Sequence, residues 1–476
     1  MEPSALSNNN GKETSTGGFK KVLGRLDMVL FILSAILTLD ALMLTAAIGP
    51  SSISWWVVVL VLFFVPYALM TTELATTYPE QGGLFIWVKR AFGGKWAART
   101  TWLYWINVAL WMPSVYILFS DIVSQLFAPE MQTWARVGIG IVMTWVTIGL
   151  GIISTSYGRW IPNIGALLKV VMVIVVGILG LVYATKSGTP NDLSLPNFVP
   201  QLKEGINFLP VVAFNFMGFE LLASAAGEMR NPKKDIPKAI LISGVLIAIF
   251  YLLGTLSILM IFRVEDLEAV KSIMDAYWVV FGESGIGGIV VAILGIMTLF
   301  TIMANMVCWT MGANRTIARA AQEGEFPAIF ARLHPINRTP VGASIIIGLV
   351  ATLIILIYGF LAGGREGVFR LLFAFSSVVY LLPYLFVFLT FLKLRKMDVD
   401  LDRPYRVPLN PALTTMMVVI CELFILQAIV FFLWQPDKTL EWSFVGPALL
   451  GVVLVFIAGE IVLEIATMKK QNSSSR

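Results

Sequence analysis

Long apolar runs, separated by short polar segments, repeat along the whole chain. Each run holds about eighteen or more residues, enough for an α-helix to cross a bilayer core of about 30 Å. Twelve runs are expected to be helices, at residues 22–48, 53–74, 100–127, 136–154, 161–184, 206–227, 239–262, 285–312, 341–361, 368–392, 412–434 and 442–466. Lipid admits only helices and closed barrels, and these runs lack the strict alternation of barrel strands. The pattern therefore predicts an all-α integral membrane protein with twelve transmembrane helices.

The basic residues predict which side of the membrane each loop faces. With the N-terminus inside, 25 of the 34 Lys and Arg residues fall on the cytoplasmic side, eight fall on the other side, and Lys169 lies within a span. Cytoplasmic loops carry such an excess of positive charge. We therefore expect both termini in the cytoplasm, with tails at 1–21 and 467–476 and a cytoplasmic loop at 393–411.

Composition excludes several classes of function. The chain is 58% hydrophobic and 13% charged, whereas soluble domains are about 45–50% apolar and about 25% charged. This excludes a soluble enzyme, a nucleic-acid-binding protein and a disordered scaffold. The net charge of +5 follows from membrane orientation. Two Cys and one His cannot assemble a zinc site, and no P-loop pattern occurs. We expect no metal, no cofactor, no ATP and no catalytic residue, with lipid as the surrounding partner.

Two spans carry polar residues at the depth where a helix is expected to break. Thr38 and Asp40 lie in the first span, and Asn215, Gly218 and Glu220 lie in the sixth. Broken helices at corresponding positions of two halves mark the binding site of many transporters, because freed backbone groups can hold a substrate's carboxylate and ammonium. Gly218 lets the chain leave the helix. The alternative is that Gly218 only permits close helix packing and that Asn215 bonds across helices.

Charged residues inside spans indicate function, because a charge at the bilayer centre costs about 2.5–3.5 kcal/mol. Lys169 lies about a third of the way into the fifth span. A buried amine there can exchange a proton or act as a fixed cation; the alternative is that it reaches back to the cytoplasm. Asp40 can meet the amine of a substrate or pair with Lys169, and the sequence favours neither reading.

Short motifs between the spans give a resemblance to a known family. They are Pro79–Gly83, Gly218–Glu220, Gly227–Glu228, Asn231–Pro237, Ala318–Arg319, Phe326–Pro327 and Arg403–Pro408. In this order and topology the chain resembles the amino acid–polyamine–organocation permeases. The resemblance implies a five-plus-five inverted-repeat core shared with neurotransmitter transporters. The core covers 22–392, with repeats 22–184 and 206–392, and two accessory helices follow in 412–466.

The resemblance also implies roles for individual residues. Lys169 falls where sodium-coupled relatives hold sodium, and it couples proton flow together with Glu220. The gate residues are Tyr104, Phe214 and Glu220. The substrate-binding residues are Thr38, Asp40, Ala41, Met112, Phe214, Asn215, Gly218, Trp309 and Ser376, and Phe375 and Ser377 are candidates for selectivity. Aromatic rings can hold a cation, although most rings in such a chain face lipid or core. Where the family usually has a Gly-Ser/Ala-Gly break, residues 37–41 contain no glycine.

These features predict a secondary active transporter of the cytoplasmic membrane. We expect proton-coupled, sodium-independent transport of an amino acid or amine by alternating access. The alternatives are an amino acid/amine exchanger or polyamine transporter, and a channel or amino acid sensor on a transporter fold. A membrane-embedded enzyme is disfavoured, since the spans contain no His and no paired catalytic acids. The oligomeric state stays open.

Overall fold

The computed structural model describes residues 23–153, 160–201, 205, 208–267, 273–282, 284–362, 366–434 and 439–474. The tail predicted at 1–21 lies outside these residues. The tail predicted at 467–476 is helical as far as Ser474, because the last helix continues beyond the apolar run. Apart from those bounds, the domain division remains a prediction.

The described residues form an all-helical bundle. Its first half contains α1 (Arg25–Ile36), α2 (Asp40–Ala46), α3 (Ser51–Val59), the π-helix η1 (Leu60–Phe64), α4 (Val65–Thr77), α5 (Leu84–Phe92), α6 (Gly94–Phe127), α7 (Thr133–Ile153) and α8 (Trp160–Ser187). The second half contains η2 (Leu195–Phe198), α10 (Leu209–Asn215), α11 (Glu220–Ser224), η3 (Ala226–Glu228), α12 (Pro232–Ile261), α13 (Val264–Leu267), α14 (Ile273–Phe281), α15 (Gly285–Gln322), α16 (Val341–Ala362) and α17 (Glu366–Met397). Two further helices follow, α18 (Pro411–Leu433) and α19 (Trp442–Ser474).

The predicted spans correspond to these helices. Within the described residues, ten helices are long and apolar enough to cross a membrane, and α1 with α2 forms one more span that is bent by 51°. The remaining predicted span is the shorter apolar segment Leu209–Ser224, which α10 and α11 divide. The two spans predicted to break are therefore broken. The fold class is that of an all-α bundle of membrane-length helices, as predicted.

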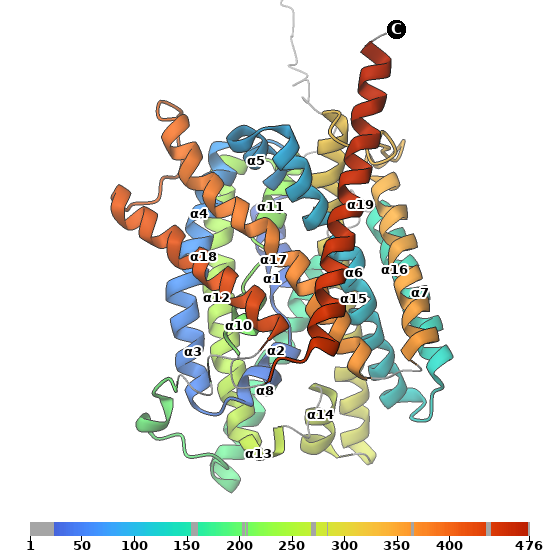
Figure 1. Ribbon diagram of the computed structural model, residues 1–476. Helices are drawn as coiled ribbons and strands as arrows, with labels where there is room; N and C mark the ends of the chain where they lie inside the picture. The colour runs from blue at the N-terminus through green and yellow to red at the C-terminus, as the bar shows by residue number, and fades with distance from the viewer. Residues whose placement is uncertain are drawn as a thin grey trace, which may run out of the picture.

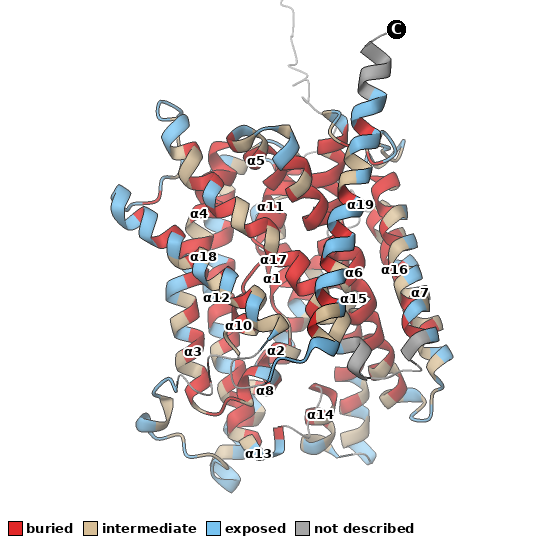
Figure 2. Cartoon of the chain, viewed as in Figure 1, coloured by how far each residue is buried: buried red, intermediate tan, exposed pale blue. Residues whose placement is uncertain are grey.

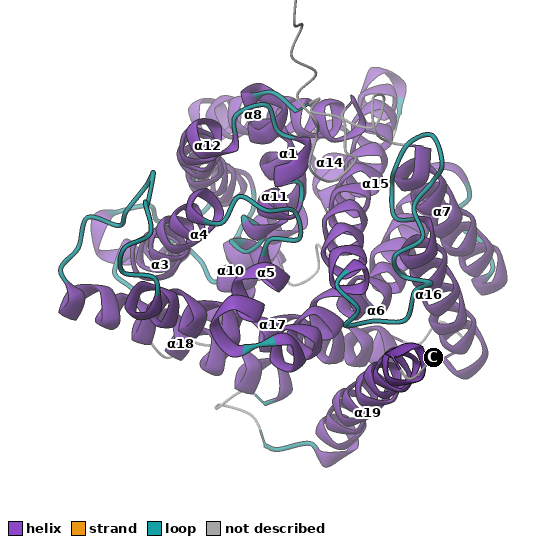
Figure 3. Cartoon of the chain, turned by 90° about the horizontal axis from the view of Figure 1, so that it is seen from above, coloured by secondary structure: helices purple, strands orange, loops and turns teal. Residues whose placement is uncertain are grey.

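The broken helices lie at the centre of the bundle. Helix α1 packs against α8, α12 and α15, and α11 packs against α15 and α1. Seen from above, α18 and α19 lie on the rim (Figure 3). Buried residues concentrate on the inner helices (Figure 2). By contrast, α19 exposes large apolar side chains such as Leu450 and Leu454, which are 59% and 56% exposed. Such a surface suits contact with lipid tails rather than water.

The two ends of the bundle carry different short helices. Helix α5 lies at one end, and α13 and α14 lie at the opposite end (Figure 1). We call these the inner and outer ends, since the sequence predicts the first to be cytoplasmic. The described residues between α12 and α15 form two short helices, α13 and α14. Helix α15 continues ten residues beyond the predicted bound at 312, so Arg315 and Arg319 are helical.

Candidate functional site

The break in the first span is held open by side chains rather than by glycine. The last carbonyls of a helix have no partner within the helix. Here the four carbonyls at residues 34–37 each accept a hydrogen bond from a side chain of another helix. The donors are Lys169 of α8, Tyr251 of α12, and Asn305 and Trp309 of α15. Because all four carbonyls have partners, α1 can end at Ile36 although residues 37–41 contain no glycine.

Lys169 places its ammonium at the carbonyl end of α1. Its Nζ donates to the Ser34 and Leu37 carbonyl oxygens at 2.7 and 2.5 Å, and the residue is 2% exposed. The carbonyl end of a helix is the negative end of its dipole, where a cation is stabilised. The lysine therefore points into the bundle rather than toward the cytoplasm. Among the described residues, no ion pair joins Lys169 to Asp40. Asp40 is instead the first residue of α2.

The second break lies beside the first. Gly218, between α10 and α11, has φ +133°, a left-handed conformation that favours glycine. Thr38 Oγ1 donates to Asn215 Oδ1 at 2.7 Å, which joins the two breaks directly. The Tyr251 hydroxyl accepts from the Thr38 N–H at 3.2 Å and donates to the Ile36 carbonyl at 2.9 Å. It also lies 3.3 Å from the Asn215 carbonyl oxygen. The breaks thus form one hydrogen-bonded unit at the centre of the bundle.

Four aromatic rings form a closed ring of contacts next to this unit. Trp111, Phe214, Tyr380 and Trp309 meet edge to face, with successive centroid distances of 6.4, 5.0, 5.3 and 5.9 Å. We call these four residues the aromatic box. The centre of a square of this size is about 4 Å from each corner, within the roughly 6 Å reach of a cation–π contact. Phe373 and Phe432 also pack against Phe214. The four rings contact one another directly, so a cationic group would have to separate them before it could reach their faces.

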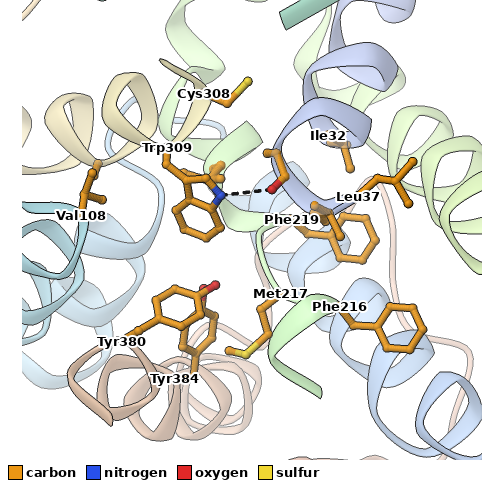
Figure 4. Close-up of a cluster of buried hydrophobic side chains, with 14 of the residues drawn as sticks. Ile32, Leu37, Val108, Phe216, Met217, Phe219, Cys308, Trp309, Tyr380 and Tyr384 are labelled. Carbon is orange, nitrogen blue, oxygen red and sulfur yellow. Dashed lines mark hydrogen bonds between the residues drawn. The ribbon is translucent and has the colours of Figure 1, made fainter. Parts of the chain in front are cut away.

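Glu220 links the aromatic box to the second break. It is 1% exposed, and its carboxylate accepts from Tyr104 at 2.9 Å, from Tyr384 at 2.7 Å and from Tyr67. The Tyr384 and Tyr380 hydroxyls are 2.8 Å apart, so a side chain of the box belongs to the same network. Figure 4 shows both tyrosines facing Trp309, whose N–H donates to the Ala35 carbonyl. A movement of the box can therefore reach Glu220 through two hydroxyl groups.

The other predicted site residues lie on the same helices. Ala41 and Met112 are buried on α2 and α6, and Met112 is next to Trp111, the residue that supplies a ring to the box. The Ser376 and Ser377 hydroxyls both donate to the Phe373 carbonyl of their own helix. The Phe375 ring packs against Gly451 of α19, and its role in selectivity stays a prediction. Phe373 of the same helix meets Phe214 instead.

A buried ion pair lies toward the inner end, where it joins α15 to η3. Arg315 of α15 forms a bidentate contact with Glu228 of η3, at 2.5 and 2.9 Å, and the side chains are 3% and 5% exposed. The Leu23 N–H donates to the Glu228 carbonyl, and the Arg230 N–H donates to the Leu23 carbonyl. Beside the pair lies a cavity of about 20 Å³, room for about one water molecule. Its wall includes Ala225. The ion pair and these backbone bonds join α15, η3 and the residues before α1 at the inner end.

The sequence reading missed several of these residues. They are Tyr67, Trp111, Tyr251, Asn305, Tyr380 and Tyr384. One signal was available for the tyrosines: each lies inside an apolar span, and a buried tyrosine hydroxyl usually has a hydrogen-bond partner. The identity of the partner depends on the packing of distant helices.

Removal of the Tyr251 hydroxyl tests whether it supports both breaks. Tyr251→Phe keeps the ring that stacks on Trp56 at 4.4 Å. It leaves the Ile36 carbonyl and the Thr38 N–H without the hydroxyl as a partner. Each unsatisfied buried group costs about 1–3 kcal/mol. We expect a lower melting temperature in detergent and weaker substrate binding. Tyr183→Phe, at a 42% exposed position on α8, is the control. Equal effects of the two variants would contradict this role.

Comparison with known proteins agrees with this geometry. The amino acid permease family matches residues 23–466. A Lactococcus lactis protein named "Probable agmatine/putrescine antiporter AguD" is 31% identical over 92% of this chain and 93% of its own length. A glutamate/gamma-aminobutyrate antiporter of the same species is 24% identical over 73% of this chain and 71% of its own. The histidine permease HisP of Lactococcus lactis is 24% identical over 79% and 82% of the two chains. With its broken central helices and a family match over nearly its whole length, the chain belongs to the amino acid permease family of membrane transporters.

Proposed function

We propose that the protein exchanges positively charged amines or amino acids across the cytoplasmic membrane by alternating access. The aromatic box supports this proposal, because four rings gathered beside the two breaks could separate around a cationic group and hold it by cation–π contacts. The name of the relative with 31% identity, an agmatine/putrescine antiporter, favours the same class of substrate and the same exchange. Both termini would lie in the cytoplasm.

The geometry supports a coupling of substrate binding to gating. A cation in the box would contact Tyr380, whose hydroxyl reaches Glu220 through Tyr384. Glu220 begins α11, so a shift of its carboxylate would move the second break. The opening of the inner end would then require separation of Glu228 from Arg315. Substrate occupancy and gate opening would be linked in this way, as exchange requires.

Sodium independence is part of the proposal. The Lys169 ammonium occupies the carbonyl oxygens of Ser34 and Leu37 as a fixed cation. A sodium ion needs such oxygens as ligands, and the lysine already takes them. We also propose that the protein works without ATP or any cofactor, driven by the gradients of its substrates.

Proton-coupled uptake is the second candidate, favoured by the burial of Lys169. A buried lysine can release its proton during a cycle, as catalytic lysines do. In that case an inward proton gradient would drive net uptake into vesicles that contain no substrate. Exchange, by contrast, needs substrate on both sides.

Counterflow in liposomes tests these candidates. The purified protein is reconstituted with unlabelled amine inside, and the entry of labelled amine or amino acid is measured with and without sodium or a proton gradient. Exchange predicts entry only into preloaded liposomes, whatever the gradients. Gradient-driven entry into empty liposomes would replace exchange with proton coupling, and substrate binding without flux would indicate a sensor.

A shortened side chain at Phe214 tests the aromatic box. Phe214→Leu removes one ring, and a cation–π contact contributes about 0.5–2 kcal/mol. We therefore expect the half-saturation concentration for a cationic substrate to rise about 2- to 30-fold. Phe360→Leu is the control, because Phe360 is 74% exposed on α16. An unchanged half-saturation concentration in Phe214→Leu would exclude the box as the cation site.

A further inference from the structure

We propose that Phe432 of α18 is a positioning residue for the outer gate, by which we mean the Phe214 ring. Phe432 holds this ring against the aromatic box and so sets how readily the site opens toward the outer side. Helix α18 would thereby take part in transport, although it follows the inverted-repeat core that the sequence predicts. The inference rests on the proposed alternating access and on the gate role expected for Phe214. It concerns control of the site and not the identity of the substrate.

Three phenylalanines from three helices contact one another beside the box. The centroid of the Phe214 ring lies 6.1 Å from that of Phe373 on α17 and 6.0 Å from that of Phe432, and the latter two are 6.0 Å apart. We call these residues the phenylalanine triad. Each is partly exposed, whereas Trp309 and Tyr380 of the box are 5% and 2% exposed. The triad therefore extends the box from its buried side toward the surface.

The triad lies on the outer side of the second break. Helix α11 leads into η3, whose Glu228 pairs with Arg315 toward the inner end. Helix α10 lies on the other side of Gly218, so it is the outer half of this span. Phe214 is the next-to-last residue of α10, and Phe432 is the next-to-last residue of α18. The end of α18 thus meets the end of the outer half-helix.

Helix α18 is held against the core along its length. Thr414 near its start accepts a hydrogen bond from Arg395 of α17 at 3.1 Å, and the Phe424 ring lies 5.6 Å from that of Phe63 in η1. By contrast, α10 has seven residues, ends at a break and packs against α18, α2 and α3. A short segment that ends at a break can move as a unit past its neighbours. Phe432 is therefore a fixed partner for a ring on a movable segment.

Loss of this contact should affect binding from one side of the membrane. The contact is present in every form with a closed outer gate, both occluded and inward-open, and absent from the outward-open form. Binding from the inner side begins and ends with this gate closed, so its affinity should not change. Binding from the outer side ends with closure, so it should weaken. An edge-to-face pair of rings supports a change of about 2- to 10-fold.

Thiol labelling from the outer side tests the proposal without a substrate. Ser377 lies four residues after Phe373 and three before Tyr380, on the same side of α17, and is 1% exposed. Once the chain's two cysteines are replaced, Ser377→Cys reports the opening of the outer gate to a membrane-impermeant reagent. We expect Phe432→Leu to raise the labelling rate about 2- to 10-fold. Phe432→Tyr keeps the ring and should stay near the starting rate.

Phe431→Leu is the matched control, because it makes the same change at the preceding residue of α18. The Phe431 ring contacts no other aromatic ring within the part of the chain that the structure describes. Counterflow in liposomes of uniform orientation then gives the half-saturation concentration for an amine on each side. In Phe432→Leu the outer value should rise about 2- to 10-fold and the inner value should stay the same. A general loss of packing would change both values or lower the maximal rate.

The outcomes separate this inference from the proposed function. Equal labelling rates in Phe432→Leu, Phe431→Leu and the parent protein would overturn the role of Phe432 and leave the proposed exchanger intact. An equal rise in both half-saturation concentrations, or a rise in Phe432→Tyr as large as in Phe432→Leu, would overturn it as well. Phe432→Met, which has a similar volume and no ring, replaces Phe432→Leu if that variant does not fold. Absence of transport of every amine and amino acid by the parent protein would instead overturn the proposed function.

Discussion

Lys169→Gln is expected to abolish exchange and to lower the melting temperature. The change removes a charge-assisted hydrogen bond from each of the Ser34 and Leu37 carbonyls. In the variant, the Ser34 carbonyl oxygen keeps its hydrogen bond from the Asn305 amide at 3.0 Å. The Leu37 carbonyl oxygen loses the hydrogen bond that Lys169 donates to it. A buried carbonyl without its partner costs about 1–3 kcal/mol, and loss of the cation at the end of α1 adds to this. The first break would then lose its fixed geometry.

Counterflow of labelled amine into preloaded liposomes measures this effect, together with thermal unfolding in detergent. Lys186→Gln is the matched control, since that lysine is exposed in the last turn of the same helix. It should change neither property. Full exchange by a stable Lys169→Gln protein would contradict the role of Lys169 as the cation that holds the break.

Lys169→Arg separates a fixed cation from a proton carrier. Arginine keeps its charge at physiological pH, so it cannot release a proton during the cycle. The exchange proposal predicts that this variant still exchanges amines, although more slowly because of the larger side chain. A stable arginine variant without any flux would favour proton coupling.

The positions of the helices and of their breaks were predictable from the sequence. Apolar runs long enough to span a membrane defined the helices, and Gly218 with its polar neighbours marked the second break. The first break was located by Thr38 and Asp40, two polar residues in an apolar run. Both signals are local, so they need no knowledge of how helices pack.

The rotation of each helix was not predictable. Successive residues of an α-helix point about 100° apart, so Trp111 and Met112 lie on different sides of α6, as Phe373 and Phe375 do on α17. In a soluble protein a polar face would define this rotation, but here the lipid and the core are both apolar. The box therefore contains Trp111 where the sequence suggested Met112, and Phe375 faces α19.

The convergence of three tyrosines on Glu220 was unpredictable for a related reason. Tyr67, Tyr104 and Tyr384 come from α4, α6 and α17, which are far apart in the chain. Only the tertiary arrangement brings their hydroxyls to one carboxylate. The sequence could indicate that Glu220 needs partners, because a charge within a span rarely lacks them.

Arg315→Gln is expected to open the inner end. The change leaves the Glu228 carboxylate, which is 5% exposed, without its bidentate partner. Removal of one member of a buried ion pair costs about 3–5 kcal/mol, because the other charge stays buried. A transporter can relieve this cost without unfolding, because separation of η3 from α15 would expose the Glu228 carboxylate to water. The population should therefore shift toward an inward-open form.

Thiol labelling at Ala225 measures this shift. Ala225 lines the cavity beside the ion pair. The chain's two cysteines, Cys308 and Cys421, are both buried. They are replaced before Ala225→Cys is introduced, so that the new thiol is the one that is labelled. We expect Arg315→Gln to raise the rate of labelling from the inner side at least tenfold. Arg136→Gln is the control, because its outer-end pair with Asp121 is 38% and 41% exposed and such pairs contribute only about 0–1 kcal/mol.

The double variant Glu228→Gln with Arg315→Gln separates the charge effect from a loss of packing. It leaves no unpaired charge, so labelling should return toward the wild-type rate and the melting temperature should rise above that of Arg315→Gln. If the single variant is folded but is labelled no faster than wild type, the pair does not close the inner end. If the double variant is labelled as fast as the single one, the arginine acts through packing, since burial of a lone carboxylate cannot then be the cause.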